Sequence, residues 1–284
     1  MATLLSLKRR INAAKNVSKT TKAMQMIAAS KLKRAQDAAL NARPYVEKLT
    51  VLAQDASAKT TAVTKHPYME SPADNHKTLL IAISPDKGLC GGLITNLTKE
   101  FLSFIDTEKD VPCIIVGKKI EQQVVKLPNE VLATFNFGNT LPTFDMVFPL
   151  KKLIDDYYLT GKVARVMVLT TDFANFFSQT PRISQLLPLT LPEQEVKADT
   201  YQIVEPSIDA LVPTLLEHYV EMTLFQTLLE SYLSEQASRM ITMQNATNNA
   251  KDIIESLQLE YNKTRQANIT SELLDLMGGR AIHG

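Results

Sequence analysis

Cysteine is nearly absent from this sequence of 284 residues. Cys90 and Cys113 are the only two, too few for a disulfide framework or a thiolate metal site, which favours a reducing compartment. The four histidines do not have the spacing of metal ligands. No apolar run approaches the length of a transmembrane helix, and no secretory apolar segment stands at the N-terminus. We therefore expect a protein without metal, cofactor or membrane span.

A net excess of charge is also missing, because the formal net charge is +1. Attraction to nucleic acid or to an anionic membrane would need a local patch. Residues 1–34 form one, with nine Lys or Arg and no acidic residue. The first 44 residues contain no aromatic side chain for base stacking, so an acidic protein partner fits better. A basic coiled-coil protein that binds nucleic acid remains an alternative.

Glycine and proline are missing from both ends of the chain. Residues 1–43 and 214–277 contain neither and are rich in Ala, Leu, Lys, Gln, Glu and Met, which predicts long helices. At ~1.5 Å per residue the second helix would be roughly 96 Å long. Since a compact globule of this chain length is far smaller than that, the helix either breaks or projects as a stalk.

Heptad spacing favours the stalk. Steps of three and four residues from Val212 to Tyr261 meet twelve apolar or aromatic positions out of fifteen, and the same steps from Leu4 to Leu49 meet eleven out of fourteen. Such a sustained seam is typical of a coiled coil. The seams are similar in length, and the alanines of the first suit the larger residues of the second, so an antiparallel coiled coil of the two terminal helices is predicted.

The C-terminal seam ends at Tyr261. Its continuation is polar at Thr264, Asn268, Ser271 and Asp275, while a new apolar set begins at Ile269, Leu273, Leu276 and Met277. Residues 262–284 are therefore expected to extend beyond the N-terminal helix as a solitary tip. A lone helix with an apolar face needs another protein to cover it.

The middle of the chain predicts an α/β domain. Short apolar runs at 78–84, 111–117, 131–138 and 165–171 alternate with helical patterns such as 92–106 and 143–159, which indicates a largely parallel sheet. In chain order, the expected domains are an N-terminal coiled-coil helix over 1–58, a linker over 59–76, the α/β domain over 77–206, and a C-terminal helix over 207–284 with its tip from 262.

The turn S-P-D-K-G-L-C-G-G, residues 84–92, suggests a nucleotide site at first sight. It lacks the G-x-G-x-x-G spacing, no P-loop pattern occurs in the chain, and Lys87 precedes the glycines. Cys90 has no histidine near it in sequence to act as a base. A tight turn that docks a helix on a sheet is the favoured interpretation, with a nucleotide-dependent enzyme using residues 86–92 as an alternative.

Three motifs resemble the gamma subunits of F-type ATP synthases. They are K-T-T-K-A-M-Q-M-I-A-A-S-K-L (19–32), D-K-G-L-C-G-G (86–92), and S-E-Q-A-S-R-M-I-T-M-Q-N-A-T-N-N-A (234–250) continuing to L-E-Y-N-K-T-R-Q-A-N-I-T (259–270). The resemblance covers nearly the whole length. It implies an antiparallel coiled coil of the terminal helices with a central Rossmann-like α/β domain.

The resemblance also implies a function. In that family the chain is a non-catalytic rotor, the central stalk that couples ion-driven rotation of a membrane c-ring to ATP synthesis or hydrolysis on the beta subunits. Its partners are the hexamer of alpha and beta subunits, the epsilon subunit and the c-ring, with no nucleic acid and no nucleotide of its own. The expected location is peripheral, on the cytoplasmic face of a bacterial plasma membrane, because no presequence precedes the first motif.

Residues that would contact the hexamer follow from the matched motifs. Arg265, Gln266 and Thr270 match polar contacts to a beta-subunit loop, and Lys22 and Met24 match the neighbouring stretch of the N-terminal helix. Both groups stand where the two seams turn polar.

Further contacts are implied at the two extremes of the rotor. The tip, 269–284, corresponds to the part that turns inside an apolar sleeve of the hexamer, and its apolar positions are Ile269, Leu273 and Met277. The foot would contact the epsilon subunit and the c-ring through the segment before Glu205, namely Tyr201, Gln202, Ile203 and Val204.

Overall fold

The chain forms two compact units. A computed structural model describes residues 3–59, 66–71, 77–108, 110–125, 127, 129–190, 205 and 207–281. Unit 1 comprises Met1–Ala28 and Met240–Gly284, and unit 2 comprises Ala29–Arg239. The boundaries of the four predicted domains stay a prediction.

One long helix begins the chain and another ends it, and the remaining elements lie between them in sequence. The elements are α1 (Leu4–Lys59), η1 (Pro67–Met69), β1 (Thr78–Ile83), α2 (Leu93–Thr107), β2 (Cys113–Val116), α3 (Lys118–Val124), β3 (Val131–Phe135), η2 (Phe144–Met146), α4 (Val147–Tyr158), β4 (Arg165–Phe173), β5 (Gln179–Leu187) and α5 (Ile208–Ala281). All four predicted strands and both predicted helices of the middle segment are present.

The five strands of unit 2 form one sheet in the order β3-β2-β1-β4-β5. β1 pairs in parallel with β2 and β4, and β2 pairs in parallel with β3, while β5 runs antiparallel to β4. The predicted largely parallel sheet is thus confirmed. Helical crossovers between parallel strands place helices on both faces, as in doubly wound folds.

The sequence prediction did not include β5. Its run, Q-T-P-R-I-S-Q-L-L, holds a proline and several polar residues, which is weak strand evidence. Pro181 is tolerated because β5 pairs with β4 alone and lies at the sheet edge, where a missing N–H breaks no ladder. An edge position therefore explains a strand that composition does not reveal.

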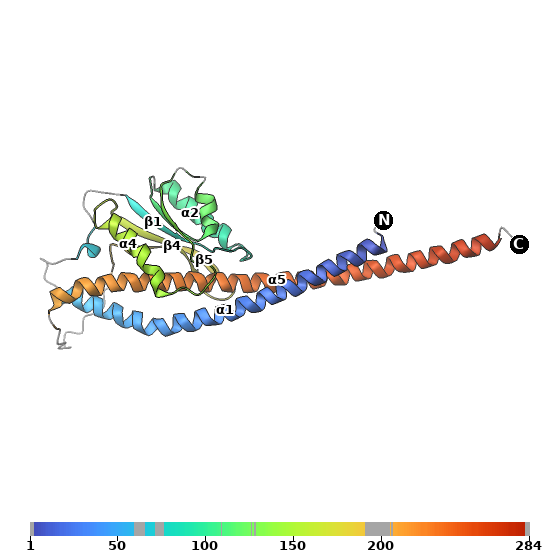
Figure 1. The fold of residues 1–284 in the computed structure, drawn as a ribbon, viewed down its shortest axis with the longest axis horizontal. Coiled ribbons are helices and arrows are strands. Elements are labelled where there is room, and N and C mark those ends of the chain that lie inside the picture. Colours follow the sequence, from blue (N-terminus) through green and yellow to red (C-terminus); the bar gives the residue numbers. More distant parts are fainter. Residues whose placement is uncertain are drawn as a thin grey trace. The chain divides into compact units, whose positions relative to one another are not determined.

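Helices cover the two faces of the sheet (Figure 1). One face of β1, with Leu79, Ile81 and Ile83, packs in a cluster with residues of α4 and of the first part of α5. The opposite face, with Leu80 and Ala82, packs against residues of α2 and α3. Alternate residues of a strand point to opposite faces, so β1 is buried on both sides.

In unit 1 the N-terminal part of α1 and the C-terminal part of α5 pack antiparallel. Leu7 and Ile11 form an apolar cluster with Leu257 and Tyr261. Further along α1, Thr21 forms a hydrogen bond with Thr247, earlier in α5. Rising numbers on one helix therefore meet falling numbers on the other, as the seams predicted.

The seam positions are those the helices bury. Every position of the Leu4–Leu49 seam and every position of the Val212–Tyr261 seam is buried or half-buried. α1 continues through Pro44, and α5 contains Pro213 near its start. Proline removes one backbone hydrogen-bond donor from a helix. Packing of the seams stabilises both helices despite the missing hydrogen bond.

The C-terminal end of α5 has no partner helix among the described residues. Residues 265–274 are all exposed, and Tyr261 is the last seam residue with a described contact to α1. The solitary tip over 262–284 stays a prediction. Among the described residues no helix is both long enough and apolar enough to cross a membrane.

Candidate functional site

The glycine-rich turn 86–92 packs against α5 in unit 2. Arg239 on α5 donates from Nη2 to the carbonyl oxygens of Lys87 (3.1 Å) and Gly88 (3.3 Å), and from Nε to the Gly88 oxygen (3.3 Å). The Ser238 hydroxyl donates to the carbonyl oxygen of Cys90 (2.7 Å). The turn thus offers oxygen acceptors to a cationic side chain, whereas a phosphate cradle offers N–H donors.

Burial and charge hold the arginine in place. Glu235, one helical turn before Arg239, accepts from its Nη2 at 2.6 Å, and each side chain is only about a tenth exposed. Burial raises the pKa of the Glu235 carboxyl, and the Arg239 guanidinium opposes that rise. Removing either partner would leave the other charge buried and uncompensated.

A second loop meets the same stretch of helix. Asn139, between β3 and η2, accepts at its carbonyl oxygen from Lys31 on α1 and at its side-chain oxygen from Gln236 on α5 (3.0 Å). Burial, the Arg239 charge and the Lys87 charge lower the pKa of Lys31. Both helices are therefore tied to loops at the carboxyl edge of the sheet.

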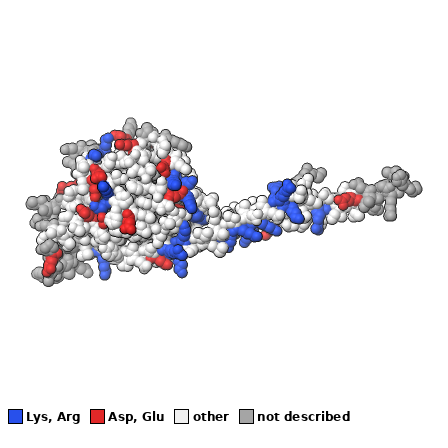
Figure 2. All heavy atoms as spheres, viewed as in Figure 1, with Lys and Arg blue, Asp and Glu red and all other residues white. Residues whose placement is uncertain are grey.

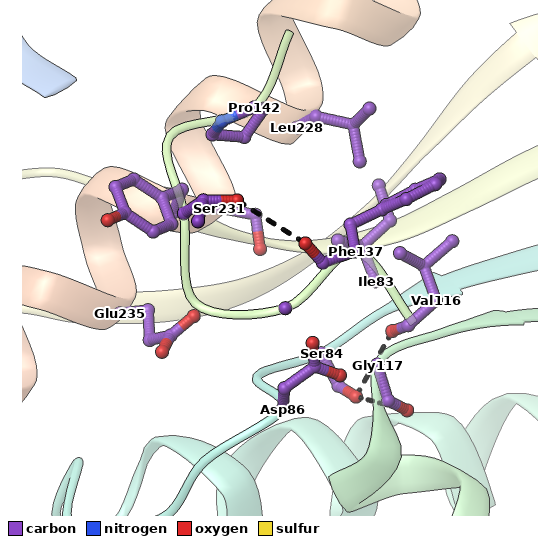
Figure 3. A pocket seen from close by; sticks show the side chains of 13 residues that line it. Ile83, Ser84, Asp86, Val116, Gly117, Phe137, Pro142, Leu228, Ser231 and Glu235 are labelled. Atoms are coloured by element: carbon purple, nitrogen blue, oxygen red, sulfur yellow. Dashed lines mark hydrogen bonds between the residues drawn. The ribbon is translucent and has the colours of Figure 1, made fainter. Parts of the chain in front are cut away.

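A small cavity opens at that edge, beside the ends of β1 and β2 (Figure 3). Its volume is about 50 Å³, and α5 contributes Leu228, Ser231 and Glu235 to its wall. Rossmann-type folds bind nucleotides at the carboxyl edge of the sheet, but pockets for such ligands are ~300 Å³ or larger. This cavity is therefore too small for a dinucleotide, and α5 forms one of its walls.

Gly117 lines the cavity, and its backbone conformation requires glycine at this position. It has φ +96°, and a Cβ there would stand 1.9 Å from the Ser84 carbonyl oxygen. The Ser84 hydroxyl lies within 3.2 Å of the oxygens of Val116 and Gly117 and of the Ile120 N–H. The strand ends are locked to each other without a ligand.

The polar interruption of the α1 seam, at Ser18, Thr21 and Gln25, is half-buried in unit 1. Thr21 bonds Thr247 at 2.7 Å, so a misfit in one seam is satisfied by a misfit in the other. Lys22 donates to Gln25 at 3.3 Å, and Met24 is 39% exposed. Lys22 and Met24 are accessible, as a contact surface requires.

The predicted contact residues on α5, Arg265, Gln266 and Thr270, lie further along that helix than Thr247. Arg265 and Gln266 are exposed, and the Thr270 hydroxyl donates to the Gln266 carbonyl oxygen. Thr247, the described partner of Thr21, precedes Arg265 by roughly 27 Å of helix at ~1.5 Å per residue. The structure therefore does not bring the two predicted groups together, and they form separate surfaces of unit 1.

The predicted contact residues of the tip and the foot are described only in part. Ile269 is 47% exposed and Leu273 is 56% exposed, so both are free to contact another protein. Met277 lies in α5 beyond the residues whose side chains are described. The predicted foot contacts, Tyr201, Gln202, Ile203 and Val204, lie outside the described residues.

Positive charge gathers on the helices of unit 1 (Figure 2). The part of α1 in this unit carries no acidic residue, and all six of its bases are exposed: Lys8, Arg9, Arg10, Lys15, Lys19 and Lys22. The other helix carries charges of both signs over Met240–Leu274. The two sides of the pair are therefore chemically different.

Comparisons with known proteins agree over the whole chain. The model of the family described as ATP synthase matches residues 3–281. The ATP synthase gamma chain of Dehalococcoides mccartyi is 39% identical, with 99% of each chain covered, and that of Paraburkholderia phymatum is 38% identical, also with 99% of each covered. The chain belongs to the ATP synthase gamma-chain family.

Solved structures share the fold of this gamma-family chain. The rotor of the Euglena gracilis mitochondrial ATP synthase matches with a TM-score of 0.68 at 18% identity, over 94% of this chain and 98% of that one. The central stalk of the Tetrahymena thermophila enzyme matches with a TM-score of 0.60 at 24% identity, over 80% and 99%. The predicted fold class, terminal coiled coil plus Rossmann-like domain, is confirmed.

The residues around Arg239 were not predicted as a site. They belong to the motif at 234–250, which carries part of the heptad seam and of the resemblance to gamma subunits. The missed signal was the run S-E-Q-A-S-R, in which five polar residues occupy six consecutive positions of a helix, so that no solvent-facing stripe can hold them all. Positions 231–239 are all buried.

Proposed function

We propose that this protein is the central-stalk rotor of an F-type ATP synthase, coupling ion-driven rotation of a membrane c-ring to ATP synthesis or hydrolysis on the beta subunits. Its own role is non-catalytic. The proposal places it at the cytoplasmic face of a bacterial plasma membrane, as a peripheral part of the complex. Membership of the gamma-chain family supports this location.

One observation carries the proposal beyond family membership. The α1–α5 pair buries its seam as far as Tyr261, and α5 then continues with every described residue of 265–274 exposed. Ile269, Leu273 and Leu274 are all exposed on a stretch of helix without a described partner helix, and an exposed apolar patch of this kind marks a protein contact surface. A surrounding protein sleeve, supplied by the alpha and beta subunits, would cover them.

The coupling has a physical form. A shaft whose sides differ, one basic and one of mixed charge, presents a different surface to each of three catalytic interfaces. Each interface then favours a different conformation and a different nucleotide affinity. Turning the shaft changes those affinities in sequence, so rotation and ATP chemistry drive each other.

The contact residues follow from this arrangement. We assign Lys22 and Met24 to one surface and Arg265, Gln266 and Thr270 to another, each facing beta-subunit loops at its own height. The sleeve contacts are proposed at Ile269, Leu273 and Met277. The epsilon subunit and c-ring contacts are proposed at 201–204.

Reconstitution tests the function. The chain is mixed with the alpha and beta subunits of the same organism, and ATP hydrolysis is measured in the isolated complex. A complex that hydrolyses ATP and turns a bead attached to this chain is expected. Failure to form any ATP-hydrolysing complex would refute the proposal.

Truncation tests the sleeve. Removal of the residues after Leu273 is expected to weaken assembly or coupling while the melting temperature of the isolated chain stays close to that of the full-length protein. Leu273→Ser, against the control Leu259→Ser at a position 65% exposed on the paired part of α5, separates a specific contact from general loss of apolar surface. A large fall in melting temperature on truncation would show that the tip packs internally.

A further inference from the structure

Hydrogen bonds connect α1 and α5 to two loops of unit 2, close to the boundary of that unit. The unit boundary falls between residues 28 and 29 on α1 and between 239 and 240 on α5. Lys31 stands just inside the first crossing, and Arg239 is the last residue before the second. We call the following set the collar: Lys31, Gln236, Ser238 and Arg239 with their acceptors in the loops 86–92 and 136–143.

In the collar, every donor is a helix side chain and every acceptor is a loop oxygen. Six hydrogen bonds run from helix side chains to loop oxygens: three from Arg239, and one each from Ser238, Gln236 and Lys31. Two loops that are separate in sequence are engaged, one after β1 and one after β3. The collar therefore ties α5 to both loops and α1 to the second loop.

α5 also meets the sheet through one further hydrogen bond, from the Ser234 hydroxyl to the Thr171 carbonyl oxygen of β4 (2.9 Å), and through an apolar stripe. Val212, Leu216, Val220, Leu224 and Leu228 pack in the apolar cluster with α4 and β1. Apolar burial is not directional, so such a stripe resists separation of the helix from the sheet but resists sliding or twisting only through shape. Hydrogen bonds depend on angle as well as distance, and they resist rotation of the helix about its own axis.

Arg239 is suited to this task. Its planar guanidinium presents donors in a fixed fork, and Glu235 holds that fork at 2.6 Å from the same helix. Both residues are 8% exposed, so water competes little for the bonds. A torque applied to α5 would strain these bonds before it could turn the helix beneath the loop.

We propose that the collar is the torsional anchor of the rotor, the place where torque passes between the α/β domain and the two helices. The proposal rests on the function proposed above. It assigns to Arg239, with Glu235 as its support, a positioning role in energy coupling. The glycine-rich turn 86–92 then supplies the carbonyl oxygens that hold Arg239 and Ser238 of α5.

Bead rotation on the assembled complex measures the anchor directly. The bead is attached to unit 2 through Phe177→Cys, because Phe177 is 83% exposed at the β4–β5 turn and both natural cysteines are buried. Angular variance during a catalytic dwell is inversely proportional to torsional stiffness. Arg239→Gln is expected to raise that variance about twofold, because it removes three of the six collar bonds, each a comparable net contributor.

A matched control excludes a general effect of losing an arginine. Arg182 on β5 donates to the Asp172 carboxylate on β4 at 3.0 Å, and its side chain is 63% exposed. Arg182→Gln is therefore expected to leave the angular variance unchanged. Arg239→Lys keeps the charge without the fork and should fall between wild type and Arg239→Gln. Ser238→Ala, which removes one bond, gives a smaller rise and serves if Arg239→Gln does not assemble.

The outcomes separate the two proposals. If the wild-type complex rotates and no collar variant changes the variance, or if Arg182→Gln changes it equally, the anchor is refuted and the rotor function stands. If the wild-type chain forms no rotating complex, both proposals fall.

Discussion

Replacing Arg239 by methionine is expected to destabilise the protein strongly, because it leaves the Glu235 carboxylate buried without its partner. The side chains of this pair are 10% and 11% exposed, and Arg239 also satisfies two loop carbonyl oxygens. Breaking a buried ion pair by removing one partner costs about 3–5 kcal/mol. We therefore expect Arg239→Met to lower the free energy of unfolding by that amount near pH 7.

The pH dependence identifies the cause. Burial already raises the pKa of Glu235, and loss of the opposing guanidinium raises it further. A carboxyl whose pKa is higher in the folded state favours folding below its unfolded pKa, about 4.3, and that stability is lost as pH rises through the folded pKa. The destabilisation by Arg239→Met should therefore be smaller at pH 4 than at pH 7.

Urea unfolding of the purified chain, followed by circular dichroism at both pH values, measures these differences. Glu235→Gln in the Arg239→Met background should restore part of the loss at pH 7, because no buried charge then remains. Arg182→Met, which removes an exposed pair with Asp172, should cost less than about 1 kcal/mol. A loss below about 1 kcal/mol for Arg239→Met, equal at both pH values, would refute the reasoning.

Other positions give further expected outcomes. Gly117→Ala should destabilise the α/β domain by at least about 1–2 kcal/mol from left-handed strain alone, since its Cβ would also meet the Ser84 oxygen at 1.9 Å; an unchanged melting temperature would contradict this. Leu257→Ala, in the coiled-coil seam at 6% exposure, should cost ~2–5 kcal/mol, whereas Leu259→Ala, 65% exposed, should stay within about 0.5 kcal/mol. Burial raises the pKa of Cys113 to about 12, so a thiol reagent at pH 8 should modify neither cysteine until urea is added; rapid reaction of the folded protein would disprove it.

Periodicity predicted the coiled coil well. A two-helix seam repeats one local rule over many turns, so the pattern of Leu4–Leu49 and Val212–Tyr261 carries its own evidence, and every seam position is buried or half-buried. The parallel strands were equally visible as continuous apolar runs, because both faces of β1 are covered. β5 was missed, since an edge strand needs neither feature.

The sequence by itself determined which residues form the two long helices, where their shared seam ends, and to which family the chain's motifs point. Those properties depend on neighbours in the chain and on repeated spacing. The tertiary structure decided what the turn 86–92 does: it places Arg239, about 150 residues away in sequence, against the carbonyl oxygens of Lys87 and Gly88. No local pattern can show that contact, because a hydrogen bond between distant segments depends on how the sheet and the helix pack.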